Sequence, residues 1–328
     1  MSRKPIAENM AKRIIMAKRI MTRKPRVAIV GAGSLANFLA VALAAAGFPI
    51  AEIVARDSPQ SRRRARALAA KVGARTVTVH SAALDATLLW FCVPDREIRG
   101  AASLLADHLA ARASRHQKGR VHSKVRFAFH SSGALLSREL EPLRKAGAAI
   151  ASVHPLMTFV AGAHPSAHPS EHPSDQPSMQ GVPFAIEGDD AATRVARRIV
   201  RELGGESFRL PAARKAAYHA WATMTSPLLL AFLVTLEEAA RAAGLTREDA
   251  RRKSLPIINQ TLANYSRLGP AQSFSGPLIR GDAETVAKHL AALRKHPGAR
   301  EVYVALARAA LRGLPVKNRN GLSQLLRD

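Results

Sequence analysis

Cysteine and aromatic residues are scarce in this sequence. Its single cysteine, Cys92, excludes a disulfide within the chain, and only 5% of the 328 residues are aromatic. Cys92 lies in the apolar run 88–93, which is typical of a buried strand rather than of a reactive thiol. A chain without disulfides suits a reducing compartment, so we expect a cytoplasmic protein.

Acidic residues are also few, since 24 Asp and Glu stand against 50 Lys and Arg and give a formal net charge of +26. Such an excess raises nucleic acid as a partner. Residues 1–26 account for +8 of it, because they contain nine basic residues and one acid. Neither interleaved aromatic residues nor a zinc or helix-turn-helix pattern accompanies the charge. We therefore favour a solvated basic surface over a nucleic-acid site.

Long uninterrupted apolar runs are absent as well. The uncharged stretches 27–51 and 216–236 have the length of a membrane span. Glycine, asparagine and proline interrupt the first, and His219, Ser226 and Pro227 interrupt the second. We therefore expect no membrane insertion.

Two segments fall outside the expected core. Residues 1–24 form a basic extension that we predict to be disordered, with Met21 as an alternative start and a transit peptide as an alternative role. Residues 162–180 contain a His-Pro-Ser repeat with proline at every fourth position, which forbids a helix and predicts a disordered insertion. Its histidines lack the fixed geometry of a metal site, so no metal is predicted.

Strand and helix patterns alternate over the first two-thirds of the chain, which predicts a mostly parallel sheet covered by helices on both faces. Beyond residue 211 only helical patterns continue. We therefore expect one domain over 25–211 and an all-helical domain over 212–328. Strands are expected at 26–31, 50–56, 75–79, 87–93, 124–130, 148–153, 183–187 and 206–210, and helices between most of them at 34–46, 60–72, 95–111, 134–146 and 190–203.

The turn after the first expected strand carries a glycine-rich motif. Residues 31–36 read Gly-Ala-Gly-Ser-Leu-Ala and match Gly-x-Gly-x-x-(Gly/Ala) between a β-branched strand and an apolar helix. Gly31 allows a tight turn and Gly33 lets the backbone approach a pyrophosphate, which would rest on the helix N-terminus at Ser34 and Leu35. The predicted fold class is thus α/β, a Rossmann-type parallel sheet domain followed by an all-helical C-terminal domain.

The end of the second expected strand bears on the choice of nicotinamide cofactor. An NAD-binding domain usually has an acid there for the ribose 2′-hydroxyl, whereas an arginine suits the 2′-phosphate of NADP. The segment reads Arg56-Asp57-Ser58, and we expect Arg56 and Ser58 to hold a 2′-phosphate. NADP is the predicted cofactor, and Asp57 leaves NAD as the alternative.

Further polar segments end other expected strands. Because ligands bind at the carboxyl ends of parallel strands, we expect these segments to share a cleft, although turn formation alone would also explain them. They are Val93-Pro94-Asp95, the segment 130–133 with Ser132, and the segment 154–156.

These segments occur in order with Ala-Ile-Glu-Gly at 185–188, Tyr218-His219, and Ser-Gly-Pro-Leu-Ile-Arg-Gly-Asp at 275–282. Together they resemble Rossmann-like proteins with domain-of-unknown-function family 2520, in the wider group of pyrroline-5-carboxylate reductase and 6-phosphogluconate dehydrogenase. The resemblance covers about residues 25–310. It implies a helical domain that forms a homodimer and a cleft between the two domains, and it implies no particular substrate. Ser226-Pro227 departs from the family's Ser-Asn, and the proline predicts a kinked helix.

Hydride transfer needs a group that exchanges a proton near neutral pH. The candidates are His154, His130, His219 and Tyr218, with His154 first because the following proline holds its backbone extended. Arg280 is a candidate to bind a carboxylate or phosphate of a small, anionic substrate. The predicted function is an NADP-dependent oxidoreductase acting on a small molecule. A non-catalytic NAD(P)-binding or sensor protein and, less favoured, a nucleic-acid-binding protein are the alternatives.

Overall fold

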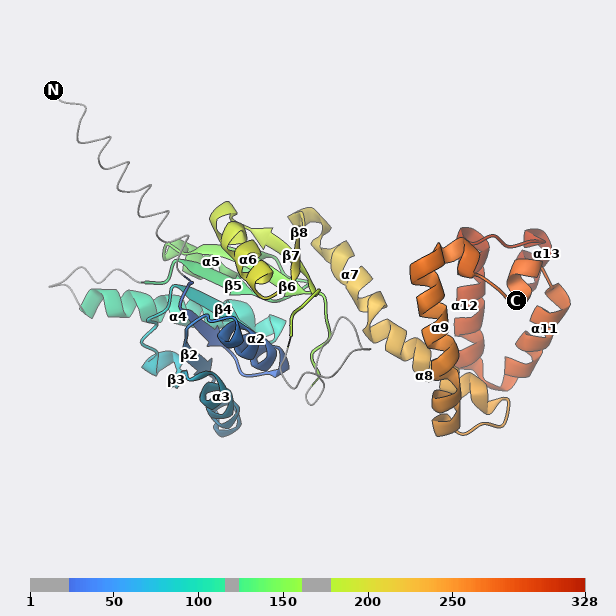
Figure 1. Cartoon of the computed structure of the whole chain (residues 1–328), viewed down its shortest axis with the longest axis horizontal. Helices are drawn as coiled ribbons and strands as arrows, with labels where there is room; N and C mark the ends of the chain where they lie inside the picture. Colours follow the sequence, from blue (N-terminus) through green and yellow to red (C-terminus); the bar gives the residue numbers. More distant parts are fainter. Residues whose placement is uncertain (1–23, 116–123, 161–177, 328) are drawn as a thin grey trace, which may run out of the picture. The chain divides into compact units, whose positions relative to one another are not determined.

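The computed structural model describes residues 24–115, 124–160 and 178–327, which divide into two units after Ala222 (Figure 1). The first unit contains an eight-stranded sheet and the second is helical, so the predicted α/β class followed by a helical region is confirmed. The strands are β1 Val27–Val30, β2 Ile50–Ala55, β3 Arg75–Thr78, β4 Leu88–Phe91, β5 Phe127–His130, β6 Ala149–Pro155, β7 Pro183–Gly188 and β8 Glu206–Arg209.

The strands lie in the order β3-β2-β1-β4-β5-β6-β7-β8, and every neighbouring pair is parallel except β6 with β7. Apolar side chains of helices α2, α3 and α6 cover one face of the sheet, and those of α4 and α5 cover the other. Two buried cores therefore sandwich the sheet, and the carboxyl ends of β1, β4, β5 and β6 meet at one edge. The helices are α2 Ser34–Ala45, α3 Pro59–Val72, α4 Asp95–Arg115, α5 Glu141–Lys145 and α6 Asp190–Glu202.

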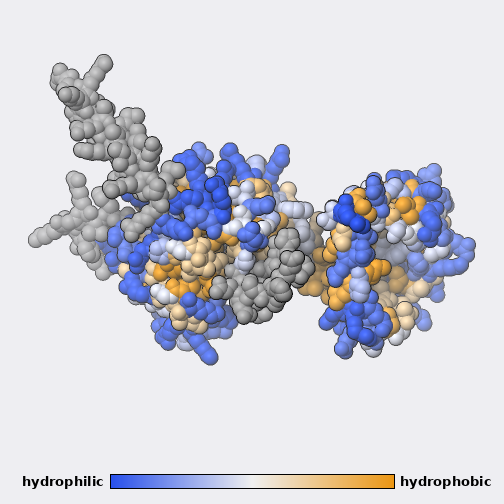
Figure 2. Space-filling view, in the orientation of Figure 1, coloured by the Kyte–Doolittle hydropathy of each residue, from blue (hydrophilic) through white to orange (hydrophobic). Residues whose placement is uncertain are grey.

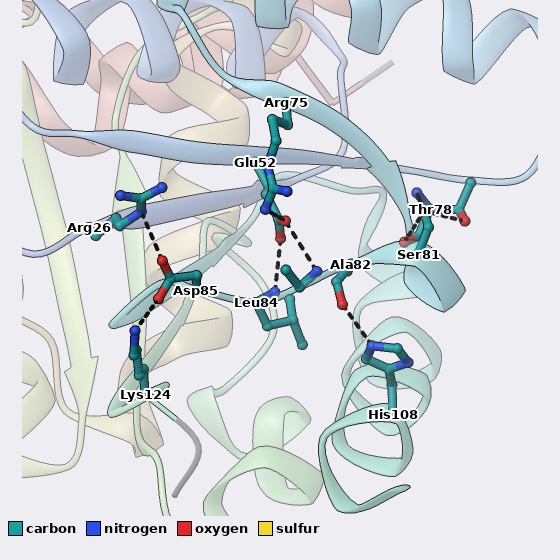
Figure 3. Close-up of polar contacts among 11 residues, drawn as sticks. Arg26, Glu52, Arg75, Thr78, Ser81, Ala82, Leu84, Asp85, His108 and Lys124 are labelled. Atoms are coloured by element: carbon teal, nitrogen blue, oxygen red, sulfur yellow. Dashed lines mark hydrogen bonds and ion pairs between the residues drawn. The ribbon is translucent and has the colours of Figure 1, made fainter. Parts of the chain in front are cut away.

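A buried carboxylate fixes the loop that leads into β4 (Figure 3). Glu52 on β2 is fully buried, and its carboxylate accepts hydrogen bonds from the backbone N–H groups of Ala83 at 3.1 Å and Leu84 at 3.0 Å. Arg75 donates to the same carboxylate at 2.6 Å. A buried charge is costly unless it is paired, so these three donors make Glu52 the anchor of the loop.

The boundaries of the first unit differ from prediction at two places. The division falls at residue 222 rather than 211, because helix α7 (Lys215–Thr225) begins with Lys215 and Tyr218 buried. The predicted disordered insertion 162–180 is too long at its end, since Met179 is 1% exposed and belongs to the core on the α6 face. Residues 161–177, which contain most of the repeat, and the extension 1–23 lie outside the described residues.

The second unit is built from α8 Pro227–Arg241, α9 Arg247–Ser273, α10 Pro277–Arg280, α11 Ala283–Ala292, α12 Pro297–Gly313 and α13 Arg319–Leu325. Its core gathers apolar residues of α11, α12 and α13. The predicted interruption at Ser226-Pro227 is confirmed, because Ser226 has the non-helical angles φ −127° and ψ −74° and separates α7 from α8. The stretch Ala212–Arg241 is long and apolar enough to cross a membrane by length and composition, and 6% of its apolar window is buried.

Candidate functional site

The glycine-rich loop connects β1 to α2 at the carboxyl end of the sheet. Gly31 has a φ of +111°, and a Cβ there would lie 2.5 Å from the carbonyl oxygen of Cys92, so only glycine fits. Gly33 is the N-cap of α2 and offers no side-chain cap, and a Cβ on it would meet nothing within 4 Å. The first turn of α2, which begins at Ser34 and Leu35, contains no acid. Open space beside uncapped helix amides fits a pyrophosphate.

A cavity of about 540 Å³ continues from this loop along the ends of β2 and β4. Gly31, Gly33, Val93, Pro94, Arg56 and Ser58 all line it, so the structure brings these six predicted cofactor residues together. A cavity of this size is within the range of cofactor sites. Burial raises the pKa of the Cys92 thiol, in the same wall, to about 12, so this group stays protonated at neutral pH.

Charged groups at the end of β2 pair with one another. Arg56 donates from Nη1 to Glu97 Oε1 at 2.8 Å while its side chain remains 68% exposed. Asp57 is paired with Arg62 at 3.0 Å, which partly neutralises the acid that would otherwise favour NAD. Ser58 accepts a hydrogen bond from the backbone N–H of Ser61 and thereby caps α3. The cavity wall also contains Arg64, which the sequence did not single out.

A second cluster of polar side chains lies at the ends of β5 and β6, where α7 begins. Lys215 is 2% exposed and donates from Nζ to Ser152 Oγ. Ser152, fully buried on β6, donates in turn to the backbone carbonyl of Ser132 at 3.1 Å. Among the described residues no carboxylate lies within ion-pair distance of Lys215. Burial therefore lowers the pKa of Lys215 to about 8, against the opposing charges of Glu187 and Asp95.

His130 has a structural environment. Its Nε2 is 2.9 Å from the carbonyl oxygen of Leu136, and its Nδ1 accepts from the backbone N–H of Ser132 at 3.1 Å. Because a carbonyl only accepts and an amide N–H only donates, the ring is the neutral Nε2–H tautomer. Burial lowers its pKa to about 4 and the residue is fully buried, so we assign His130 to positioning the 130–133 turn rather than to proton transfer.

His154 and His219 lie against Gly133, and Tyr218 contacts His154. The Nδ1 atom of His154 is 2.7 Å from the hydroxyl of Tyr218, and a Cβ on Gly133 would lie 2.8 Å from His154 Nε2 and 2.7 Å from His219 Cδ2. Burial, followed by the charge of Lys215, lowers the pKa of His154 to about 4, and burial raises that of Tyr218 to about 12. The side chains of His154 and Tyr218 are therefore neutral at pH 7, and the absence of a Cβ at Gly133 leaves room for the rings of His154 and His219.

Acidic groups border this cluster on two sides. The exposed Asp95 begins α4 and accepts a hydrogen bond from the hydroxyl of Ser132 at 2.7 Å. Glu187 on β7 accepts from both the backbone N–H and the hydroxyl of Ser137, at 2.8 and 2.7 Å. Each carboxylate is thus held by a serine, and their negative charge reaches Lys215 without a direct ion pair.

Not every predicted residue belongs to this cluster. Arg280 is an exposed residue at the end of α10 in the second unit, whereas the two groups of site residues described above lie within the first unit. The sequence reasoning missed Lys215, Ser152 and Glu97. The spacing of Lys215 four residues before His219, which places both on one face of α7, was the available signal. Within the described residues no group of three or more His, Cys, Asp or Glu could hold a metal ion.

The sheet order, the glycine loop and the helical second unit define a Rossmann-type α/β protein. The chain matches the Rossmann-like domain family over residues 15–155 and the domain of unknown function DUF2520 over residues 182–310. No curated protein matches the chain.

Solved structures share this fold across both units. A candidate NADP oxidoreductase, BF3122 from Bacteroides fragilis, is 21% identical with a TM-score of 0.65, over 87% of this chain and 97% of that one. Protein TM1727 from Thermotoga maritima is 22% identical with a TM-score of 0.63, over 92% and 100%. An imine reductase from Myxococcus stipitatus, solved with NAD+, is 17% identical with a TM-score of 0.54, over 93% and 100%. At these identities the likeness concerns the fold.

Proposed function

We propose that the protein is an NADP-dependent reductase of a small molecule with a C=O or C=N group. The observation that carries this proposal is Lys215, a buried lysine without an ion-pair partner among the described residues. Burying an unpaired ammonium group costs stability, and such groups occur mainly where a reaction needs them. The fold likeness to imine reductases and to pyrroline-5-carboxylate reductase adds support for the substrate class.

The cavity of the first unit has residues suited to each part of the cofactor. The Gly33 turn and the first turn of α2 would hold the pyrophosphate, and Val93 and Pro94 would line the path toward the nicotinamide. When bound, the reduced nicotinamide supplies a hydride to the substrate carbon. The chain itself must supply the matching proton to the oxygen or nitrogen.

Lys215 is suited to hold that proton. With a pKa of about 8 it is mostly protonated at pH 7 yet releases its proton far more readily than an exposed lysine. Ser152 accepts one of its N–H bonds and so fixes the direction of the remaining two. His154 and Tyr218, both neutral, would bind and orient a polar substrate group. This division of roles replaces His154 as the first candidate acid.

The preference for NADP rests on the charges at the end of β2. Arg56 and Arg64 line the cavity, and Arg62 pairs with Asp57, which also lines it. Two guanidinium groups would bind a 2′-phosphate through charge-assisted hydrogen bonds. Glu97 opposes this, because it is the present partner of Arg56 and would repel a phosphate. We expect Arg56→Ala to lose most of any preference for NADP over NAD.

We also propose a homodimer formed through helices α8 and α9 of the second unit. Among large apolar residues there, Leu230 is 63% exposed, Val234 53% and Ile257 67%, and Figure 2 shows apolar surface within the second unit. Patches of this kind on soluble proteins mark interaction sites. A membrane is the alternative partner of this apolar surface. Lys215 and Tyr218, near the start of the stretch Ala212–Arg241, are however buried within the first unit. Light scattering should show a dimer that Leu230→Asp with Ile257→Asp dissociates, and a monomeric wild type would contradict this.

The proposed activity can be tested without knowing the natural substrate. Oxidation of NADPH would be followed with a panel of small ketones, keto acids and cyclic imines, using wild type, Lys215→Met and the exposed neighbour Arg214→Ala as control. Loss of a general acid should lower kcat/KM at least 100-fold while NADPH affinity stays within about twofold. Full activity of Lys215→Met would refute the role of Lys215. NADPH binding without turnover of any substrate would favour the non-catalytic alternative.

A further inference from the structure

A second cavity, of about 450 Å³, lies at the β7–β8 end of the sheet, beside the first half of α6. Strands β4, β5 and β6 separate it from the glycine loop at the end of β1. Three arginines line it, Arg194 and Arg197 from α6 and Arg209 from β8, together with the hydroxyl-bearing Thr193. Apolar residues at the ends of β7 and β8 complete the wall. None of these residues takes part in the proposed reduction.

The three guanidinium groups have no ion-pair partner within 4.0 Å in the described part of the chain. Two acids, Glu187 and Asp190, also border the cavity and offset part of this charge. Glu187 accepts from Ser137 with both carboxylate oxygens, and within the described residues Asp190 forms no ion pair, so three positive charges face two negative ones. The excess of positive charge beside this cavity favours an anionic ligand.

The start of α6 strengthens this charge. Its N-cap residue, Asp189, does not cap the helix, because its carboxylate accepts from the backbone N–H of Ile150 at 3.0 Å instead. The first-turn amides of this 13-residue helix therefore add their partial positive charge beside the arginines. Guanidinium groups and helix amides together are the donors that phosphate oxygens prefer.

We propose that this cavity binds the phosphate group of a small phosphorylated organic molecule. Arg194, Arg197 and Arg209 contact the phosphate, and the apolar ends of β7 and β8 contact the organic part. The volume suits a small-molecule ligand rather than a polymer, whose charge would extend along the surface beyond the cavity. The site shares no residue with the cofactor cavity, and Glu187 alone borders both it and the Lys215 cluster.

The test is calorimetric titration of the full-length protein with glycerol 3-phosphate and with inorganic phosphate, at constant ionic strength. Wild type should bind glycerol 3-phosphate at one site, and Arg194→Ala with Arg197→Ala should weaken binding at least tenfold. Ala212→Trp narrows the cavity without changing the charge and should weaken binding similarly. Arg201→Ala, an exposed arginine of the same helix outside the cavity, is the matched control and should bind as wild type does.

Three results would overturn the proposal. One is the absence of binding of either probe to wild type. A second is binding that Arg56→Ala abolishes and the α6 variants preserve, which would place the phosphate in the cofactor cavity. A third is equal weakening by Arg201→Ala and none by Ala212→Trp, which would indicate a diffuse polyanion surface. NADPH affinity, measured in the same variants, should stay unchanged and separates this test from that of the reductase.

Discussion

Replacing Lys215 by methionine should make the protein more stable at neutral pH, although the residue is buried. Methionine has a similar length and no charge, so Lys215→Met keeps the packing at the start of α7 while removing an ammonium group that has no ion-pair partner among the described residues. The change also removes the hydrogen bond from Lys215 Nζ to Ser152 Oγ.

The magnitude follows from the pKa of Lys215, which burial lowers from 10.5 to about 8. The unfolded chain binds this proton more tightly, so between about pH 8 and 10.5 the free energy of unfolding of wild type rises with pH. Below pH 8 the full cost, about 3 kcal/mol, is present. Losing the hydrogen bond to Ser152 offsets about 1 kcal/mol. Lys215→Met should thus be stabilised by about 2 kcal/mol at pH 7, and near pH 10.5, where little of that cost remains, the lost hydrogen bond should make it slightly less stable than wild type.

Urea denaturation at pH 7 and pH 10.5 measures this difference. Trp90, fully buried on β4, reports on the first unit, and Trp221→Phe in both proteins removes the signal of the other tryptophan. The reasoning would be refuted if Lys215→Met were less stable than wild type at pH 7, or if the difference did not change between the two pH values.

Further predictions concern the cofactor site and the core. Glu97→Gln frees Arg56, so the ratio of NADP to NAD affinity should rise about tenfold in calorimetry, and an unchanged ratio would speak against their pairing in solution. Glu52→Ala leaves the buried N–H of Leu84 and the half-buried N–H of Ala83 without their acceptor and should cost about 3 kcal/mol in urea denaturation, with Glu52→Gln costing less. Met179→Ala should lower the free energy of unfolding by about 2–4 kcal/mol, and an unchanged value would mean that Met179 belongs to the insertion predicted over 162–180.

The eight strands of the sheet could be predicted because apolar runs bounded by turn residues mark buried strands. The antiparallel direction of β7 could not, because a strand pattern with a period of two residues is the same in either direction. Met179 was missed for a related reason. It is a single apolar residue after a polar repeat, and its burial depends on packing against distant elements of the core.

In the candidate site, too, local features could be predicted and long-range contacts could not. The glycine loop is local in sequence, so its motif predicted both its turn and its place at the start of α2. Lys215 begins an alanine-rich helix, where a solvated lysine is the ordinary expectation. Its burial is set by Ser152, which lies 63 residues away, and the pairing of Arg56 is set by Glu97, which lies 41 residues away. Such contacts arise from sheet order and are invisible to local patterns.

The central claim, that residues 31–36 hold a nicotinamide dinucleotide, is tested most directly by titrating NADPH and NADH into wild type and Gly33→Val. A Cβ on Gly33 meets nothing in the described protein within 4 Å and its φ of −81° is not strained, so the variant should fold with an unchanged melting temperature. We predict saturable binding to wild type, tighter for NADPH, and at least a 100-fold loss in Gly33→Val because the side chain occupies the space of the pyrophosphate. No binding to wild type, or equal binding by the variant, would contradict the account.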